Sequence, residues 1–371
     1  VPAEELKKIV YETLNFEVPL VRITPQISAL ELFHGPTLAF KDVGARFMAR
    51  LLGYFTQRKE GEKGQDIHVL VATSGDTGSA VANGFLAVEG VKVHVLYPKG
   101  KVSEIQEKQF TTLGRNITAL EVEGTFDDCQ ALVKNAFMDE ELNERLFLTS
   151  ANSINVARFL PQSFYYFHAY AQLKKEGKSD AVVICVPSGN FGNITAGLFA
   201  KQMGLPIKRF IAANNKNDVF YQYLQTGDYE PRPSIATIAN AMDVGDPSNF
   251  ARILDLFGQS HKAISQEISG AYYLDDQIKA TIQKVWSEHG YLLDPHGACG
   301  YQALVDLLHD EEQGIFLETA HPAKFLDTVE SIIDESVEIP EKLQAFMKGE
   351  KQSLVIDKDF DSFRSYLLNL K

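Results

Sequence analysis

Cysteine is scarce in this sequence, and its few copies are isolated from one another. The 371-residue chain has three cysteines, Cys129, Cys185 and Cys299, and no two of them form a CxxC pair. The odd number and the wide spacing argue against a disulfide framework and against a structural zinc site. We therefore predict no metal site, and the cysteine usage fits a reducing, cytoplasmic compartment.

Long apolar runs and an excess of positive charge are also absent. No uninterrupted apolar stretch approaches the roughly 18 residues that a membrane helix needs, so we predict no membrane partner. Lysine and arginine number 36 against 49 aspartate and glutamate residues, which gives a formal net charge of −13. This balance argues against nucleic acid as a partner, although local cationic groups and backbone N–H groups could still bind a small anion.

What the sequence does contain is a regular alternation of apolar runs and helical patterns. The predicted strands are 67–73, 91–98, 116–123, 146–150, 181–187, 207–214 and 314–319. Helical segments separate them, including a long helix over 156–174 that Pro161 kinks or restarts. Such βα units predict mostly parallel sheets, and 371 residues favour two α/β lobes. Ligands are then expected where the strands end.

Lys41 lies near the head of an apolar helix that the pattern predicts from Thr37 onward. Its helical neighbours, among them Gly44 and Met48, are small or apolar. One interpretation is a lysine whose stem follows the core while its ammonium reaches water. The other is an amine in a dry pocket, where desolvation lowers the pKa and makes the amine a nucleophile toward a carbonyl. The helix alone does not decide between them.

Two glycine-rich turns connect a predicted strand to a predicted helix. The first is TSGDTG (73–78), and the second is PSGNFGN (187–193). Backbone N–H groups at such a junction suit a carboxylate or a phosphate, but a tight turn also needs glycine when it binds nothing. Neither turn contains GxGxxG or GxxxxGK[ST], so a phosphate monoester fits better than a dinucleotide or a triphosphate.

Two further segments place polar side chains next to predicted strand ends. SANSINVAR (150–158) puts hydroxyl, amide and guanidinium groups around a helix start, which suits an oxyanion but also ordinary capping. ETAHPAKF (318–325) places Thr319 after a strand, where a lone threonine is usually structural.

Three histidines, His34, His296 and His321, flank or lie within these segments without metal-ligand spacing. For each, an ordinary hydrogen-bonded role is the more frequent case. Taken together, the signals describe an amine, a cradle for a phosphate monoester and a cradle for a carboxylate. Pyridoxal 5'-phosphate bound as a Schiff base needs the amine and the first cradle, and an amino-acid substrate needs the second.

Seven segments, spread in order over about residues 31–325, resemble threonine synthase in the branch found in many bacteria and in yeast. They are HGPTLAFKD, TSGDTG, YPKGKVSEIQEKQ, SANSINVAR, VPSGNFGN, NAMDVGDPSNF and TAHPAKF. The resemblance implies the two-lobed fold type II of pyridoxal-phosphate enzymes, which is similar to the tryptophan synthase β subunit. It implies a large cofactor-binding domain (1–50 and 160–371) and a smaller α/β domain (51–159) with the substrate-carboxylate loop. Because family members usually have several dozen more residues at this end, we expect a further segment before Val1.

The resemblance also implies a role for individual residues. Lys41 would hold pyridoxal phosphate as a Schiff base and would be the catalytic base and acid. The phosphate loop of the cofactor would be Gly189, Asn190, Phe191, Gly192 and Asn193. Thr319 would bond the pyridine nitrogen, and Asp76 would lie beside the 3-oxygen of the ring. The substrate-binding residues would be Ser74, Gly75 and Thr77 for the carboxylate, and Ser153, Asn155 and Arg158 for the phosphate.

The implied reaction converts O-phospho-L-homoserine and water to L-threonine and phosphate, the last step of threonine biosynthesis. Phosphate leaves the γ carbon and water adds at the β carbon, so the enzyme would be a carbon–oxygen lyase, either a monomer or a homodimer. Two alternatives stay open. A phospho-lyase or serine/threonine dehydratase of the same fold would release an α-keto acid, and a non-catalytic α/β protein would only bind a phosphorylated metabolite.

Overall fold

Two mostly parallel sheets organise the computed structural model of the chain, which describes residues 1–57 and 66–370. Each sheet belongs to one compact unit. Unit 1 comprises residues 1–15, 41–158 and 339–371, and unit 2 comprises residues 16–40 and 159–338. Helices connect the parallel strands within each unit, so the predicted α/β class is confirmed.

The sheet of unit 1 has the strand order β11-β5-β4-β3-β6, and every neighbouring pair is parallel. Its strands are β3 (Ile67–Ala72), β4 (Val91–Pro98), β5 (Ile117–Val122), β6 (Phe147–Ser150) and β11 (Leu354–Ile356). Because a parallel sheet is covered on both faces, β3 is a nearly continuous apolar run. Its side chains alternate between two cores, with Val69 and Val71 in one and Leu70 and Ala72 in the other.

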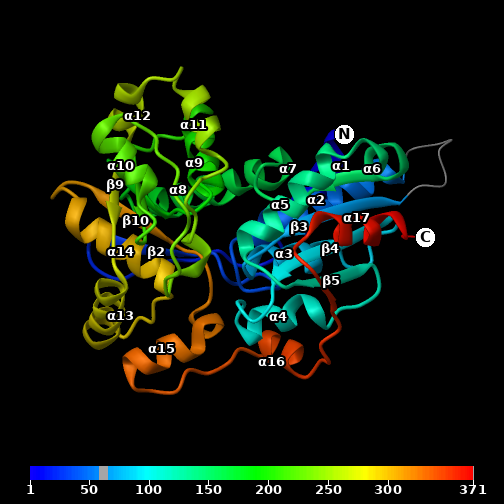
Figure 1. Cartoon of the computed structure of the whole chain (residues 1–371). Coiled ribbons are helices and arrows are strands. Elements are labelled where there is room, and N and C mark those ends of the chain that lie inside the picture. The colour runs from blue at the N-terminus through cyan, green and yellow to red at the C-terminus, as the bar shows by residue number, and fades with distance from the viewer. Residues whose placement is uncertain (58–65, 371) are drawn as a thin grey trace. The chain divides into compact units, whose positions relative to one another are not determined.

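Helices cover both faces of this sheet (Figure 1). They are α1 (Ala3–Thr13), α2 (Lys41–Thr56), α3 (Asp76–Phe85), α4 (Glu104–Thr111), α5 (Phe126–Met138), α6 (Glu140–Arg145), α7 (Val156–Phe159, at the border of the unit), α16 (Glu341–Met347) and α17 (Phe360–Leu368). From α17, Phe363 and Leu367 pack into the core that contains Leu70. Arg46 of α2 donates to the carbonyl oxygen of Thr13 in α1 (3.1 Å). These contacts explain why both ends of the chain group with residues 41–158.

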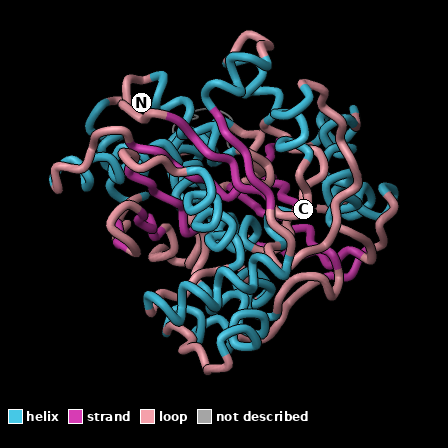
Figure 2. Tube along the Cα trace, turned by 90° about the vertical axis from the view of Figure 1, so that its left-hand side faces the viewer, coloured by secondary structure: helices cyan, strands magenta, loops and turns pink. Residues whose placement is uncertain are grey.

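The sheet of unit 2 has the strand order β1-β2-β10-β7-β8-β9, and only the β1–β2 pair among its described strands is antiparallel. Its strands are β1 (Leu20–Arg22), β2 (Ile27–Glu31), β7 (Val182–Pro187), β8 (Arg209–Asn214), β9 (Ile268–Tyr272) and β10 (Gln313–Glu318). Figure 2 shows strands lying side by side between helices. The central strands β7 and β10 are fully or almost fully buried, as their apolar sequences predict.

The helices of unit 2 follow the predicted alternation with strands. They are η1 (Leu160–Gln162), α8 (Ser163–Lys175), α9 (Gly192–Gln202), α10 (Val219–Thr226), η2 (Asn240–Met242), α11 (Phe250–Leu256), α12 (His261–Glu267), α13 (Asp275–His289), α14 (Pro295–Leu307), η3 (Pro322–Phe325) and α15 (Leu326–Ile333). The predicted effect of Pro161 is confirmed, because α7 ends at Phe159 and α8 begins at Ser163.

The division of the chain differs from the predicted domains 1–50 and 160–371 against 51–159. The borders between the units fall at 15/16, 40/41, 158/159 and 338/339, so the segments 1–15 and 339–371 group with 41–158. The reason is that α2 packs into the core of unit 1 through Ala45, Met48 and Ala49. The cofactor and substrate roles of the two domains stay predictions.

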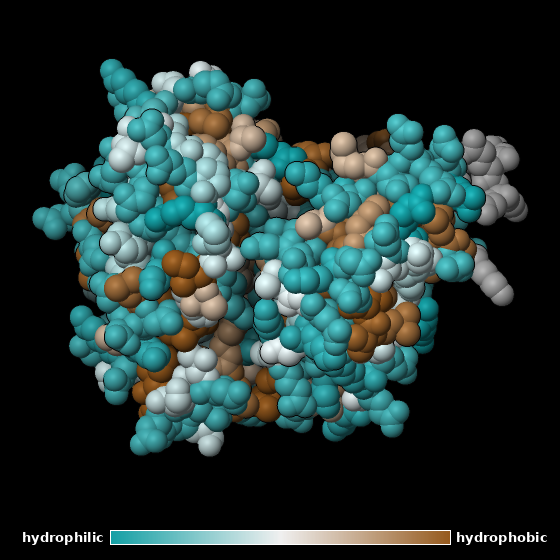
Figure 3. Space-filling view, in the orientation of Figure 1, coloured by the Kyte–Doolittle hydropathy of each residue, from teal (hydrophilic) through white to brown (hydrophobic). Residues whose placement is uncertain are grey.

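One face of the chain is seen in the space-filling view (Figure 3). Hydrophilic residues cover most of the face shown in Figure 3. Among the described residues, no helix is both long enough and apolar enough to cross a membrane. The three cysteines are buried and free.

Candidate functional site

Lys41 is the first residue of α2, and it is half-buried. The first turn of this helix lies against Arg158, because a Cβ on Gly44 would be 2.0 Å from the Arg158 carbonyl oxygen. Burial lowers the pKa of Arg158 to about 10, and the charge of Asp42 opposes that shift. The structure therefore brings the helix turn of Lys41 next to Arg158 within unit 1. A half-buried lysine is compatible with both interpretations of this amine.

The chain just before Lys41 is not helical, so the predicted helix start at Thr37 was wrong. Leu38 has a φ of +56°, which a helix does not allow. Ala39 pairs with Ala320 in an antiparallel bridge. The pairing of Ala39 with the distant Ala320 therefore outweighs the local sequence signal for a helix N-cap at Thr37.

The turn TSGDTG is organised by its own threonine. Thr73 Oγ1 accepts hydrogen bonds from the N–H groups of Gly75 (2.9 Å) and Gly78 (2.8 Å). Gly75 has a φ of +143°, a conformation that side chains rarely adopt. Because these two amides already have an acceptor, fewer backbone N–H groups of this turn remain for an anion than the motif predicts. Ser74 and Thr77 are partly exposed, so they are the better candidates for a substrate carboxylate.

Asp76 begins α3 and is buried. Its Oδ1 accepts a hydrogen bond from Nε2 of Gln106 in α4 (2.9 Å). Gln106 therefore orients this carboxyl group. Sequence reasoning missed that role, because the helical period of α4 indicates only that Gln106 faces inward.

The segment 150–158 is tied to the end of β3. Asn152 brackets the backbone of Ala72, accepting from its N–H (3.2 Å) and donating to its carbonyl oxygen (2.8 Å). Ser153, three residues after β6 ends, is partly exposed. The structure therefore brings this segment together with the turn that follows β3.

Two of the predicted phosphate ligands in this segment already have protein partners. Asn155 Nδ2 donates to the carbonyl oxygen of Ser150 (3.0 Å). Arg158 donates to the carbonyl oxygen of Ala151 and is only 2% exposed. Asn155 Oδ1 also accepts a hydrogen bond from the N–H of Ala157 at the start of α7 (3.0 Å), so capping explains part of the Asn155 signal. The contacts of Asn155 and Arg158 with a substrate phosphate stay predictions.

The loop PSGNFGN connects β7 to α9 in unit 2. Phe191 has a φ of +61° and is the N-cap of α9, an 11-residue helix that begins at Gly192. A Cβ on Gly189 would lie 2.7 Å from the Ala241 carbonyl oxygen and 3.0 Å from the Met242 Cα. Glycine is therefore required at position 189 by the close approach of η2.

Three side chains from other elements hold this loop, and sequence reasoning singled out none of them. Asn249 donates to the Asn190 carbonyl oxygen through its N–H (3.2 Å) and through Nδ2 (2.8 Å). The hydroxyls of Tyr165 and Tyr166 donate to Asn193 Oδ1 (2.6 and 2.7 Å). Asn193 Nδ2 is buried and finds no acceptor among the described residues. An orphan donor at the start of an 11-residue helix fits a bound phosphate monoester.

Thr319 follows β10 directly and is largely buried. Its carbonyl oxygen accepts a hydrogen bond from the N–H of Phe40 (2.9 Å). Lys41 is the next residue of the chain. The residue directly before the predicted cofactor lysine is therefore hydrogen-bonded to Thr319. The two predicted cofactor contacts are thereby linked through the backbone.

The histidines near these motifs have ordinary partners. His34 Nε2 lies 2.7 Å from Glu31 Oε2. His321 Nδ1 accepts from the N–H of Ala323 (3.1 Å), and burial lowers the pKa of His321 to about 4. His321 is therefore neutral near pH 7.

His296 joins the phosphate loop to the end of β10. Its Nε2 accepts from the N–H of Ala241 (3.1 Å), so Nδ1 bears the proton and donates to Asp294 Oδ1 (2.5 Å). Glu318 Oε1 accepts from the N–H of Asp294 (2.7 Å), and burial raises the pKa of Glu318 well above its usual range. Because Ala241 packs on Gly189, these contacts connect the loop to the strand that precedes Thr319.

Asp243 organises the loop between α10 and α11. It accepts hydrogen bonds from the N–H and the hydroxyl of Thr237 (3.0 and 2.7 Å) and from Nδ2 of Asn215 (2.8 Å). Burial raises the pKa of Asp243 to about 6, although these hydrogen bonds oppose the shift. Its position supports a structural role for this carboxyl group.

Comparisons with known proteins agree with this arrangement. The sequence matches the family of pyridoxal-phosphate dependent enzymes over residues 20–315 and the threonine synthase C-terminal family over residues 297–367. Threonine synthase from Haemophilus influenzae is 48% identical over 367 residues, which cover 99% of this chain and 84% of that protein.

Two solved structures share the fold at high similarity. Threonine synthase from Escherichia coli gives a TM-score of 0.91 at 46% identity, covering 100% of this chain and 84% of that one. The pyridoxal-phosphate-bound threonine synthase from Brucella melitensis gives a TM-score of 0.89 at 37% identity, covering 99% and 84%.

Proposed function

The chain belongs to the threonine synthase family of pyridoxal-phosphate-dependent enzymes, and on this premise we propose that it converts O-phospho-L-homoserine and water to L-threonine and phosphate. The observation that supports this most strongly is the nearly full-length match to threonine synthases. Pyridoxal phosphate is the cofactor of the family to which the chain belongs.

The residues of the chain fit this cofactor. We propose that Lys41 attaches covalently to its aldehyde and that Gly189–Asn193 binds its phosphate. The orphan Nδ2 of Asn193 supports the second role, because a buried donor without an acceptor suits an anion. Thr319 would bond the pyridine nitrogen, and Asp76 would lie beside the 3-oxygen of the ring. A neutral hydroxyl, unlike an aspartate, does not stabilise a full pyridinium charge, which favours elimination and replacement over transamination.

Proton transfer falls to the lysine. When bound, pyridoxal phosphate supplies an electron sink for charge that develops at the α and β carbons of the substrate. Lys41 would act as the general base and acid that removes and returns the protons at these carbons. Its place at the head of α2, packed through Gly44 against Arg158, keeps the amine in a defined position.

The substrate is held at both ends in this proposal. Ser74 and Thr77 bind its carboxylate, with Gly75 supplying the sharp turn between them. Arg158, with Ser153 and Asn155, binds the phosphate that leaves the γ carbon. A guanidinium at 2% exposure interacts more strongly with an anion than one in water does, which suits a leaving-group ligand.

We also propose a cytoplasmic location and a monomeric or homodimeric state. The three free cysteines support the reducing compartment. The net charge of −13 supports a chain that does not bind nucleic acid. Light scattering of the purified chain tests the oligomeric state.

Product analysis tests the reaction. The protein, reconstituted with pyridoxal phosphate, is incubated with O-phospho-L-homoserine in ¹⁸O-labelled water. We expect L-threonine and phosphate in equal amounts, with one label on the β-hydroxyl of threonine. Lys41→Ala should form neither, and Lys101→Ala, an exposed lysine, is the matched control. An α-keto acid without threonine would instead identify a lyase or dehydratase, and no turnover with no bound cofactor would identify a binding protein.

A further inference from the structure

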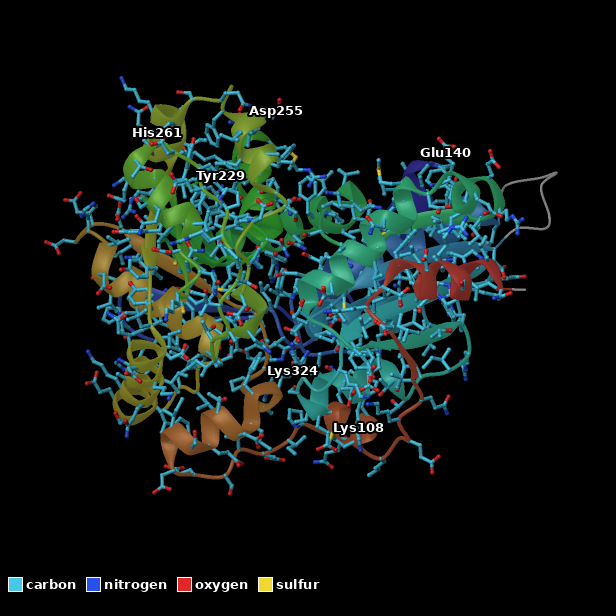
Figure 4. All side chains as sticks on the ribbon, viewed as in Figure 1. Lys108, Glu140, Tyr229, Asp255, His261 and Lys324 are labelled. Atoms are coloured by element: carbon cyan, nitrogen blue, oxygen red, sulfur yellow. The ribbon has the colours of Figure 1, made fainter. Side chains whose placement is uncertain are left out.

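Lys324 is a buried lysine that the proposed reaction does not use. It lies in η3, is 1% exposed, and its Nζ donates to the carbonyl oxygen of Thr37 (2.9 Å). Figure 4 labels this side chain on the ribbon. Because lysine is rarely buried to this degree, its amine at this position requires an explanation.

The segment that Lys324 contacts leads directly to Lys41. Residues 37–40 form no helix, and Leu38 is held at a φ of +56°, which costs an ordinary side chain about 1 kcal/mol or more. A strained, irregular segment keeps one conformation only when its surroundings fix it.

Residues 319–324 provide that support at three points. The N–H of Phe40 donates to the carbonyl oxygen of Thr319 (2.9 Å). The N–H of His321 donates to the carbonyl oxygen of Leu38 (3.1 Å). The Lys324–Thr37 bond is the third and lies at the far end of the segment. Residues 319–324, which follow β10, thus form hydrogen bonds along the whole segment 37–40 that precedes Lys41.

We propose that Lys324 is a positioning residue for Lys41. Its hydrogen bond to the Thr37 carbonyl oxygen fixes the conformation of residues 37–40. That conformation determines the position of the Lys41 backbone, which follows directly. This inference rests on the proposed function, in which Lys41 attaches to the cofactor. Because a displacement of about 1 Å at a reacting group can cost a large factor in rate or affinity, a bond four residues away can matter.

A second lysine provides a matched control. Nζ of Lys108, also labelled in Figure 4, donates to the carbonyl oxygen of Met347 (2.9 Å), the same bond at the same length. That carbonyl group belongs to α16 in unit 1 and leads to no predicted cofactor residue. Lys108→Met therefore removes the same lysine–carbonyl bond, together with an ion pair to Glu104 (3.5 Å), without disturbing the segment before Lys41.

A double-mutant cycle on cofactor affinity tests the proposal. Lys324→Met is made in the native chain and in Lys41→Ala, and the dissociation constant of pyridoxal phosphate is measured by fluorescence for all four proteins. We expect the substitution to weaken binding about tenfold or more in the native chain but less than about twofold in Lys41→Ala, where no covalent bond forms. Lys108→Met should change neither background by more than about twofold.

The outcomes separate the two claims. Equal weakening in both backgrounds, or no weakening in either, overturns the positioning role while the covalent role of Lys41 stands. If the native chain itself gains no covalently bound cofactor, the proposed function fails first and this inference fails with it. Should Lys324→Met not fold, Lys324→Gln, which keeps an amide donor, takes its place in the same cycle.

Discussion

The two strand–turn–helix junctions resemble each other in sequence but are held in different ways. In unit 1, TSGDTG is closed by Thr73, whose hydroxyl accepts from two amides of the same turn. In unit 2, PSGNFGN is held by Asn249 and by the tyrosines of α8, far away in sequence. The first turn keeps its shape through local bonds, whereas the second takes its shape from its surroundings.

This difference determines which donors remain for a ligand. The hydroxyl of Thr73 accepts from the N–H groups of Gly75 and Gly78, so this turn offers an anion mainly the partly exposed residues Ser74 and Thr77. The loop of unit 2 is supported from outside and keeps a buried donor, Asn193 Nδ2, without an acceptor among the described residues. The turn of unit 1 therefore suits the carboxylate of a substrate, which binds and dissociates in each catalytic cycle. The loop of unit 2 suits the phosphate of a permanently bound cofactor.

Glycine substitutions should separate the two junctions most strongly. A Cβ on Gly75 would lie 2.6 Å from the Gln106 carboxamide at a φ of +143°, so Gly75→Ala should lower the free energy of unfolding by about 3–5 kcal/mol. Gly189→Ala meets the Ala241 backbone and should in addition weaken cofactor binding at least about tenfold. Thermal unfolding and cofactor titration measure these effects. Gly53→Ala, where a Cβ has ordinary contacts, is the control, and unchanged cofactor affinity in Gly189→Ala would contradict the assignment of the loop.

Acid should weaken the sheet beneath the first turn. His94 in β4 lies 3.0 Å from His68 in β3 and 2.8 Å from the Tyr366 hydroxyl. Burial, with smaller contributions from His68 and Lys92, lowers the pKa of His94 to about 3. The unfolded chain then binds more protons than the folded one from about pH 6.5 down to about pH 3, so stability falls as the pH falls. The loss from His94 should reach about 3 kcal/mol by pH 4.

Unfolding measured from pH 7 to pH 4 checks this sign. His94→Gln should make the free energy of unfolding depend less steeply on pH. His168→Gln, at an exposed position, should leave this pH dependence unchanged. The carboxyl group of Asp243 near the second loop contributes with the opposite sign, because its pKa is raised to about 6 and its folded form gains protons first. An acid profile of His94→Gln as steep as that of the native chain would refute the role of His94.

Thr73→Val should damage the first turn next most severely. It leaves the buried amides of Gly75 and Gly78 without their acceptor, at a cost of about 2–3 kcal/mol in the free energy of unfolding. Thr73→Ser keeps the hydroxyl and should lose only about 1 kcal/mol. Chemical denaturation compares the three proteins, and equal losses in the two variants would show that the turn does not depend on this hydroxyl.

Removal of the tyrosine hydroxyls should give the smallest effect. Tyr166→Phe deletes the single O–H donor that lies within hydrogen-bond distance of Asn193 Oδ1 (2.7 Å) and of the Asn193 carbonyl oxygen (2.9 Å). We expect a loss of about 1 kcal/mol in stability and a severalfold loss in cofactor affinity, because Asn193 is then less firmly oriented. Tyr170→Phe in the same helix is the control, and a stability loss with unchanged affinity would argue against the orientation of Asn193 by these hydroxyls.

The sequence predicted those parts of the structure that local patterns determine. The buried strands β3, β4, β7 and β10 are apolar runs. The motifs at 73–78, 150–158, 187–193 and 318–325 do lie where a strand ends. The strand β2 was missed although it is mostly buried, because it has only five residues. The short strands β1, β9 and β11 were missed as well, because three to five largely exposed or half-buried residues leave no clear period. All three lie at sheet edges.

Within the candidate site, the residues of the motifs could be named but their supports could not. Gln106, Asn249 and Lys324 each contact a motif from a distant part of the chain. All three lie within segments that resemble threonine synthase, but the resemblance assigned them no role, and their local sequence does not reveal which distant group each one contacts. The false helix start at Thr37 has the same origin, because its carbonyl group is bound by Lys324.

Covalent attachment of pyridoxal phosphate to Lys41 is tested most directly by borohydride reduction followed by peptide mapping. The holoenzyme is reduced and digested, and the modified lysine is identified by mass spectrometry. We expect the reduced cofactor on the peptide that contains Lys41 and on no other, and its disappearance in Lys41→Ala. A label on Lys324 or another lysine, or no label on a protein that still makes threonine, would contradict this role of Lys41.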